Sequence, residues 1–232
     1  MSTILNIETS TDVCSVALCS EGEVLEHHEN YDGPSHATLL STYVQDVLKY
    51  LRSRDLKLDA VAVSIGPGSY TGLRIGLSEA KGLAYGMNLP LIGVNTLQLL
   101  TVGAMFRNFH ADDVLYAPMI DARRMEVYTA VYNPALEAIL EPQAMILNES
   151  SFDSLLENNT VVFVGNGAAK ASRIITHKNA VFENDIKPVA VDMTALSERA
   201  FRNSDFIDVA YSTPLYLKEF QAIRPKNKLL DN

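Results

Sequence analysis

The residues best placed to do chemistry lie in one glycine-rich segment, Gly66-Pro67-Gly68-Ser69-Tyr70-Thr71-Gly72-Leu73-Arg74-Ile75-Gly76. An apolar run over 60–65 precedes it, and a helix pattern of small residues follows from Thr71 to Gly86. A glycine loop that opens a helix exposes free amides, which can hold a phosphate. The segment lacks the Gly-Lys-Ser/Thr ending of a P-loop, which would supply a lysine to the phosphates and a hydroxyl to magnesium. A phosphate cradle and a tight strand-to-helix turn both remain open.

The sequence gives little support for a metal site or for a catalytic nucleophile. None of the 5 histidines lies four residues from another, the spacing that puts two imidazoles on one helix face, so we expect no metal site. The loop also lacks the glycine that follows the serine of a hydrolase nucleophile elbow. Cys14 and Cys19 fall on opposite faces of one apolar strand pattern, so we expect inert, unpaired thiols.

Nucleotide binding is the remaining chemistry. Four carboxylates lie at expected strand ends or turns, where two could meet in a cleft: Glu8, Asp12, Asp121 and Glu126. The turn containing Thr9 and Ser10 lies where actin-like ATPases keep a phosphate loop, and Gly165 and Gly167 lie where a glycine turn would contact adenosine. Those folds usually have aspartate and glycine where this chain has Glu8 and Ser10. We therefore expect a degenerate nucleotide site without ATPase activity.

Composition narrows the class of protein. The 232 residues are 47% hydrophobic and 20% charged, as in an ordinary globular protein. A net charge of −9 argues against independent nucleic-acid binding, although not against membership of a complex that binds it. We find no apolar stretch near the length of a membrane span and no signal-peptide pattern. Together with the free thiols, these features predict a cytoplasmic protein.

The expected elements form a mixed α/β protein with two similar halves. The first half should contain three strands within 4–31, a helix over 35–54, a strand over 60–65, a helix over 71–86, a strand over 88–94 and a helix to 106. The second should contain a hairpin over 114–132, an edge strand over 145–147, a strand over 160–164, and helices over 152–156, 168–175 and 192–203. We predict domains over 1–106 and 107–232, with the last ~20 residues able to pack back on the first. The basic segment 224–228 has two interpretations: it is either a frayed terminus or a flexible arm near an anionic partner.

Two expected helices have faces that could meet another protein. In the helix over 35–54, Leu39, Tyr43 and Tyr50 form a second apolar stripe beside the one that suits the sheet. This stripe indicates either a neighbouring helix of the same domain or a partner surface. In the helix over 71–86, small residues recur at every fourth position and allow close backbone approach: Gly72, Gly76, Ala80 and Ala84. Each helical glycine costs about 1 kcal/mol relative to alanine, so this helix depends on tertiary or partner contacts.

These segments resemble the TsaB family, known earlier as YeaZ. The resemblance covers the whole chain and is strongest over the first hundred or so residues. The matching segments are 4–11, 14–17, 35–36, 66–76, 92–97 and 120–128 and, more loosely, 141–142 and 214–217. The most specific is Gly-Pro-Gly-Ser-x-Thr-Gly-x-Arg-x-Gly directly after a strand. The chain departs from the pattern at Met125, where relatives often have glycine, and at Glu8, where many have aspartate.

The resemblance implies the actin-like (ASKHA) fold of two ribonuclease-H-like domains. It implies a non-catalytic scaffold subunit that binds the TsaD transferase, which forms N6-threonylcarbamoyladenosine beside the anticodon of tRNAs reading codons that begin with adenine. TsaE would join through the complex, tRNA would be met only indirectly, and the subunit alone would be a homodimer. ADP or ATP could lie at the junction with TsaD. The implied partner-binding residues are His36, Leu39, Tyr43, Asp46, Tyr50, Tyr70, Gly72, Arg74 and Gly76.

Two other functions remain as alternatives. A small-molecule kinase of the same fold needs intact phosphate loops. A metallopeptidase, the older glycoprotease assignment of the group, needs paired histidines. On the scaffold interpretation, we expect Tyr43→Asp and Gly76→Arg to abolish the complex with TsaD and to leave the fold intact.

Overall fold

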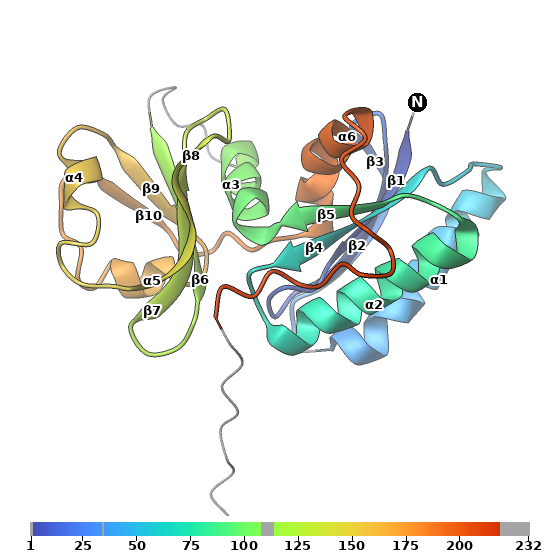
Figure 1. Ribbon diagram of the computed structural model, residues 1–232, viewed down its shortest axis with the longest axis horizontal. Coiled ribbons are helices and arrows are strands. Elements are labelled where there is room, and N and C mark those ends of the chain that lie inside the picture. Colours follow the sequence, from blue (N-terminus) through green and yellow to red (C-terminus); the bar gives the residue numbers. More distant parts are fainter. Residues whose placement is uncertain (1, 34, 108–113, 219–232) are drawn as a thin grey trace, which may run out of the picture.

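The computed structural model describes residues 2–33, 35–107 and 114–218, and Figure 1 shows two α/β units side by side. The first unit has a five-stranded sheet of order β3-β2-β1-β4-β5. Strands β2 and β3 pair antiparallel beside β1, whereas β4 and β5 run parallel to it. The strands are β1 (Thr3–Glu8), β2 (Cys14–Ser20), β3 (Glu23–Asn30), β4 (Ala60–Gly66) and β5 (Leu91–Asn95).

The second sheet repeats this topology. Its order is β10-β9-β6-β7-β8, with β7 and β8 antiparallel on one side of β6 and β9 and β10 parallel on the other. The strands are β6 (Leu115–Asp121), β7 (Glu126–Tyr132), β8 (Ala138–Ile146), β9 (Val161–Val164) and β10 (Ala180–Glu183). The predicted pair of similar halves and the actin-like fold class are confirmed. Strand β8 is longer than the edge strand expected over 145–147, and β10 was not predicted at all.

Helices cover both faces of the first sheet. Strand β1 alternates between them, with Leu5 and Ile7 in the core under α1 (His36–Ser53) and α2 (Tyr70–Met87). Ile4 points to the opposite face, which is covered by α3 (Thr96–Arg107), the 3-10 helix η1 (Ala190–Met193) and α6 (Thr194–Arg202). Successive side chains of a strand point to opposite faces of the sheet, which explains this alternation.

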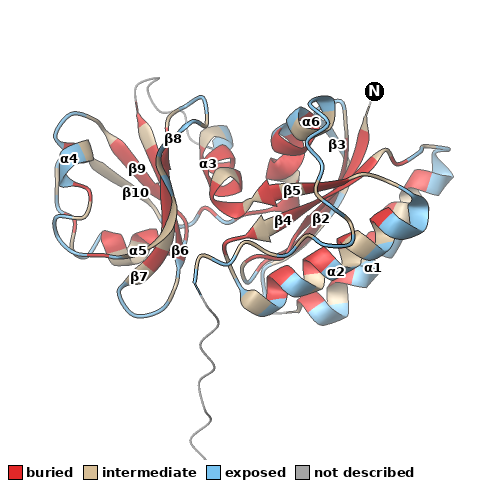
Figure 2. Cartoon of the chain, in the orientation of Figure 1, coloured by how far each residue is buried: buried red, intermediate tan, exposed pale blue. Residues whose placement is uncertain are grey.

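Helix α3 also packs on the second sheet. Leu97 and Leu100 join the core of that sheet, while Leu99 and Val102 join the core of the first. Figure 2 shows α3 buried between the two sheets, and the outer face of the second sheet is covered by α4 (Asp153–Leu156) and α5 (Ala168–Ala171). Because α3 is buried on two sides, the two units share one apolar junction.

The chain returns to the first unit at Ala190, whose amide donates to the Ser15 hydroxyl at 2.9 Å. Elements η1 and α6 therefore belong to the layer on the first sheet, and the helix expected over 192–203 is split between them. The domain division at residue 106 stays a prediction, and the basic segment 224–228 lies outside the described residues. None of the helices in the described parts of the chain is long and apolar enough to cross a membrane.

Both cysteines are buried and unpaired, as predicted. Burial, with a smaller contribution from the nearby Glu8 carboxyl, raises the pKa of the Cys14 thiol to about 11. Burial also raises the pKa of Cys19, which accepts a hydrogen bond from the Thr194 hydroxyl. Neither thiol is set up as a nucleophile, because nucleophilic attack requires the thiolate.

Candidate functional site

The glycine-rich loop turns β4 into α2. Gly66 has a φ of +112°, a backbone conformation that favours glycine because glycine has no Cβ. Helix α2 begins at Tyr70, and the Ser69 hydroxyl accepts a hydrogen bond from the Gly72 amide at 3.2 Å. Ser69 is therefore the N-cap of α2. Asn95 caps α3 in the same way, accepting from the Leu97 amide at 2.8 Å.

The turn after β1 is bonded to the first turns of α2. The Thr9 hydroxyl donates to the Gly72 carbonyl at 2.8 Å, and the Ser10 carbonyl accepts from the Ser69 amide at 2.6 Å. A Cβ on Gly72 would lie 2.1 Å from the Thr9 carbonyl oxygen, and a Cβ on Gly76 would lie 2.2 Å from Thr9 Oγ1. The turn that could have cradled a phosphate thus holds a helix in place, and these glycines make room for it.

A buried carboxyl supports this turn from beneath. Glu8 is fully buried and its carboxylate accepts a hydrogen bond from the Ser10 amide. Burial raises the pKa of Glu8, and the hydrogen bond from the Ser10 amide opposes this only in part. The carboxyl therefore fixes Ser10, and Ser10 in turn fixes the start of α2.

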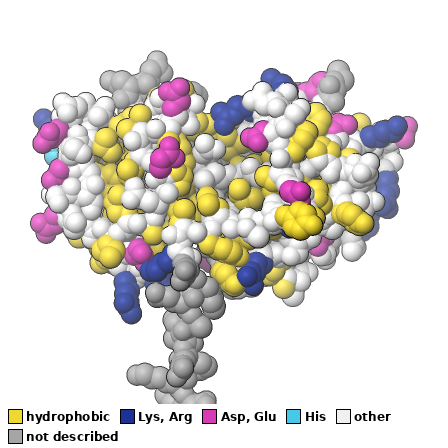
Figure 3. All heavy atoms as spheres, viewed as in Figure 1, with side chains coloured by type: hydrophobic (Ala, Val, Ile, Leu, Met, Phe, Trp, Pro, Cys, Tyr) yellow, Lys and Arg dark blue, Asp and Glu magenta, His cyan; other side chains and the backbone are white. Residues whose placement is uncertain are grey.

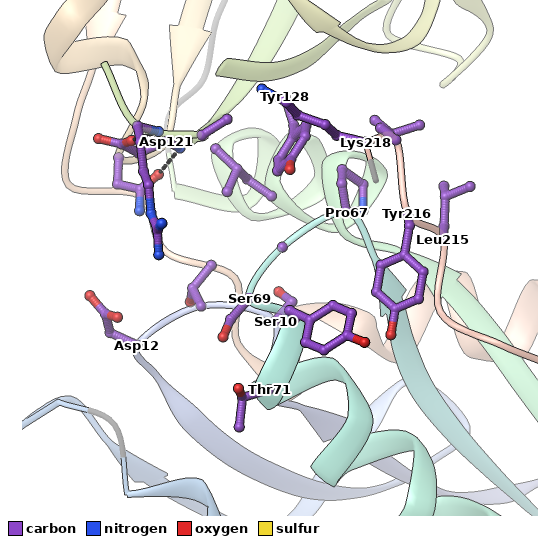
Figure 4. Close-up of a pocket in the computed structure, with 18 residues that line it drawn as sticks. Ser10, Asp12, Pro67, Ser69, Thr71, Asp121, Tyr128, Leu215, Tyr216 and Lys218 are labelled. Carbon is purple, nitrogen blue, oxygen red and sulfur yellow. Dashed lines mark hydrogen bonds between the residues drawn. The ribbon is translucent and has the colours of Figure 1, made fainter. Parts of the chain in front are cut away.

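A cleft of about 520 Å³ lies between the two units (Figure 4). Hydroxyls from Ser69 and Thr71 line one side, and Asp121 and Asn166 line the other. Two of the charged side chains that line the cleft are in ion pairs: Asp121 Oδ1 lies 2.8 Å from Lys170 Nζ, and Lys218 Nζ lies 2.6 Å from Glu126 Oε2. Among the described residues, no group of three or more His, Cys, Asp or Glu side chains could hold a metal ion.

The second pair of nucleotide candidates packs against β6. A Cβ on Gly165 would lie 2.6 Å from the Met119 carbonyl oxygen, and one on Gly167 would lie 2.9 Å from the Met119 Cβ. The Gly167 amide also donates to the Met119 carbonyl at 3.0 Å. Internal packing accounts for glycine at both positions, and contact with a nucleotide stays a prediction.

Three of the predicted partner residues are buried. The His36 ring Nε2 bonds to the Thr11 carbonyl oxygen at 2.8 Å, and Gly72 and Gly76 face Thr9. All three are buried within the isolated chain. The stripe of small residues containing Gly72 and Gly76 faces into its own unit, and direct contact of these three residues with a partner stays a prediction.

The second apolar stripe of α1 is half-buried against the same unit. Leu39, Tyr43 and Tyr50 pack on the core of the first sheet. The Tyr43 ring stacks on His28 of β3 with centroids 5.1 Å apart. The sequence left two interpretations of this stripe open, and burial within the same unit accounts for much of it. For Tyr43, the neighbour is a strand.

The remaining predicted residues lie on the outer side. Asp46 is paired with Lys49 at 2.7 Å on α1. Arg74 is exposed, with its guanidinium 4.0 Å from the centroid of the Tyr70 ring and its Nε donating to the Tyr216 hydroxyl at 3.0 Å. Both charged groups are therefore already engaged within the chain.

Sequence reasoning missed a second stripe on α2, which we call the outer stripe: Arg74, Ser78, Gly82 and Gly86. All four residues are exposed, and a Cβ on Gly82 or Gly86 would have nothing within 4 Å. The neighbouring face of α1 exposes small or polar residues, namely Thr38, Ser41, Thr42 and Gln45. A hydrogen bond of 3.0 Å from the Ser41 hydroxyl to Glu79 joins the two helices. The four-residue spacing was visible in the sequence, but its outward direction was not.

Comparison with known proteins identifies the family. The family model described as TsaD, tRNA N6-adenosine threonylcarbamoyltransferase, matches residues 25–213. The "tRNA threonylcarbamoyladenosine biosynthesis protein TsaB" of Escherichia coli (strain K12) is 35% identical over 225 residues, which cover 93% of this chain and 94% of that protein. The chain belongs to the TsaB family.

Two further likenesses bear on this TsaB chain. A solved structure from Pseudomonas aeruginosa, described as an uncharacterized protein with similarity to peptidase YEAZ, has a TM-score of 0.80 at 28% identity and covers 94% of this chain and 100% of that one. A tRNA N6-adenosine threonylcarbamoyltransferase of Desulfitobacterium hafniense (strain Y51) is 33% identical over 133 residues, 50% of this chain and 38% of that protein. The predicted family is confirmed, and the TsaB chain is also related in sequence to a transferase of TsaD type.

Proposed function

We propose that this TsaB chain is a non-catalytic subunit in tRNA threonylcarbamoyladenosine biosynthesis that binds the TsaD-type transferase through the outer faces of α1 and α2. The pathway is the one for which its TsaB relatives are named. TsaE and tRNA would be met through the transferase rather than directly. The net charge of −9 supports this division, because a subunit that grips tRNA by itself is usually basic.

The observation that carries the proposal is the exposure of Gly82 and Gly86. Each lies in α2 with open space where a side chain would be, so nothing in the chain itself requires glycine there. An exposed helical glycine costs about 1 kcal/mol relative to alanine. Close packing of a helix from another subunit on α2 would explain glycine at these two positions, because small residues let two helix backbones approach each other.

The relationship between the two proteins supports the same geometry. The D. hafniense transferase is 33% identical to this chain over 133 residues. A partner with a related helix pair could pack against α1 and α2 around a pseudo-two-fold axis, as two copies of one chain do around a true axis. We therefore also expect the isolated chain to form a homodimer through this face.

The state of the cleft supports a non-catalytic subunit over a kinase. Thr9 and Ser10 are bonded to α2, and the nearby Asp121 carboxylate is bonded to Lys170 and to the Arg123 amide. A nucleotide that used the first turn for its phosphates would have to break the bonds that position α2. The proposal accordingly places no phosphoryl transfer in this subunit.

Co-elution with the TsaD-type transferase of the same organism tests the proposal. We expect a stable complex on gel filtration, and we expect Ser78→Arg, in the middle of the outer stripe, to abolish it. Ser154→Arg is the matched control, because Ser154 is an exposed serine on α4 in the other unit. Loss of the complex in neither variant, or in both, would contradict the proposed surface. Turnover of Mg-ATP by the isolated chain would favour the kinase.

A further inference from the structure

Residues 208–218, the last that the structure describes, run beside α2 and reach the space between the two units, and we call them the strap (Figure 1). The strap contains no helix or strand, and none of its residues is buried. It begins just after Ile207, which pairs with the edge of the first sheet through a 2.8 Å bond from its amide to the Leu91 carbonyl. A segment of this kind covers other parts of the molecule without belonging to their cores.

Polar contacts hold the strap along α2. Lys81 Nζ donates to the Ala210 carbonyl at 3.0 Å and to the Ser212 carbonyl at 2.7 Å. Further along, the Tyr216 ring stacks on Tyr70 with centroids 5.1 Å apart, and its hydroxyl accepts from Arg74. Between these points, the strap and α2 enclose a groove of about 300 Å³.

Two more contacts tie the strap to the sheet and to the second unit. The Leu215 amide donates to the Ile65 carbonyl at 2.7 Å, at the end of β4. Lys218 pairs with Glu126 of β7 at 2.6 Å. The last four residues, 215–218, line the cleft between the units, so the strap touches the beginning of α2 and the cleft at once.

Because most contacts of the strap are polar and lie at the surface, its release from α2 should cost little free energy. Tyr211 is 86% exposed although the backbone on both sides of it is held by Lys81, and the contact of the strap with a hydrophobic core is made by the half-buried Val209, which packs against the core of the first sheet. Segments with few buried apolar contacts open with free energies far below that of global unfolding. Figure 3 shows hydrophobic side chains on the face that carries the strap and α2.

We propose that the strap docks and releases as one unit, and that its docked state links the outer stripe of α2 to the cleft between the units. Arg74 belongs to the outer stripe and also bonds to Tyr216, which lines the cleft. A molecule that holds Arg74 in its present position therefore stabilises the docked strap, and one that displaces Lys218 from Glu126 loosens it at α2. Two sites that bias one two-state element are coupled through it.

Hydrogen exchange of the Leu215 amide in the full chain is the direct test. Lys81→Met removes the contacts at Ala210 and Ser212 and leaves the Leu215–Ile65 bond itself untouched, as does Lys218→Met at the other end. If the strap is one unit, each variant speeds exchange at Leu215 about threefold or more, since each removes a charged contact of modest strength. Lys49→Met is the control, because Lys49 is an exposed lysine on α1 that pairs with Asp46, away from the strap.

Faster exchange confined to the amides beside each substitution, with Leu215 unchanged, would overturn the proposal. A consequence for assembly rests on the proposed function: the transferase, bound at the outer stripe, should slow exchange at Leu215. A complex that forms and leaves Leu215 exchange unchanged would overturn the coupling and leave the proposed function standing. Failure to form any complex would count against the proposed function, while the variant data on the isolated chain would still decide whether the strap moves as a unit.

Discussion

Two pairs of glycines on α2 share a residue type and a spacing and differ in what surrounds them. Gly72 and Gly76 face the turn after β1, where Thr9 oxygens occupy the space that a Cβ would fill. Gly82 and Gly86 face outward, with nothing within 4 Å of the same position. The first pair is explained by the chain's own packing. The second is not, and a residue type that its own fold does not require is the better indication of a surface for another protein.

The largest effect is expected on the inward side, from Gly72→Ala. The new methyl group would meet the Thr9 carbonyl oxygen, a backbone atom that cannot rotate away, so we expect a loss of about 3 kcal/mol in the free energy of unfolding. Urea denaturation measures this loss. An unchanged or higher stability, which helix propensity alone would favour, would show that the turn does not pack against α2 as described.

The same reasoning corrects two substitutions expected from the sequence to leave the fold intact. Gly76→Arg would force a long side chain toward Thr9, and Tyr43→Asp would remove a ring that stacks on His28. Both changes should damage the first unit itself. Loss of a partner in either variant would therefore say nothing about the surface.

On the outward side, Gly82→Ala should act in the opposite direction. The position is open and lies within α2, so the gain in helix propensity is expected to raise the free energy of unfolding by about 1 kcal/mol. The measurement is again urea denaturation of the isolated chain at low concentration. A loss of stability would mean that Gly82 has a contact within its own unit, and the contrast between the two glycine pairs would disappear.

The smallest effect concerns the carboxyl beneath the inward side. Burial raises the pKa of Glu8 above its ordinary value of 4.5, so the folded state holds this proton to a higher pH than the unfolded state does. The contribution of Glu8 is therefore present below pH 4.5 and is lost as the pH rises through the folded-state pKa. The Glu8→Gln variant has no carboxyl to ionise at this position. Its free energy of unfolding, relative to that of the natural chain, should therefore increase with pH. Parallel pH profiles of unfolding free energy for the two chains would contradict the argument.

Most of the fold followed from local patterns in the sequence. The apolar run into Gly-Pro-Gly predicted β4, and the pattern of small residues after it predicted α2. Local patterns likewise predicted the three strands within 4–31 and the hairpin over 114–132. Strand β10 escaped prediction because it has only four half-buried residues, too few to show a period.

The direction of α2 could not be read in the same way. Its two stripes, the inward one containing Gly76 and the outward one containing Gly82, differ by two positions, or about 200° around a helix. Both consist mainly of small residues, so hydrophobicity does not tell which one faces the sheet. Only the position of Thr9, supplied by a turn distant in the sequence, decides it. The stacking of Tyr43 on β3 is a tertiary contact of the same kind.

The affinity of the Gly82→Leu variant for the TsaD-type transferase tests the central claim most directly. Isothermal titration gives its dissociation constant beside those of the natural chain and of Ser154→Leu, a control on α4 in the other unit. We predict that Gly82→Leu weakens the complex at least about tenfold, or 1.4 kcal/mol, while the unfolding free energy of the isolated chain does not fall. An unchanged affinity in a variant that is folded would contradict the claim that the outer face of α2 binds the transferase.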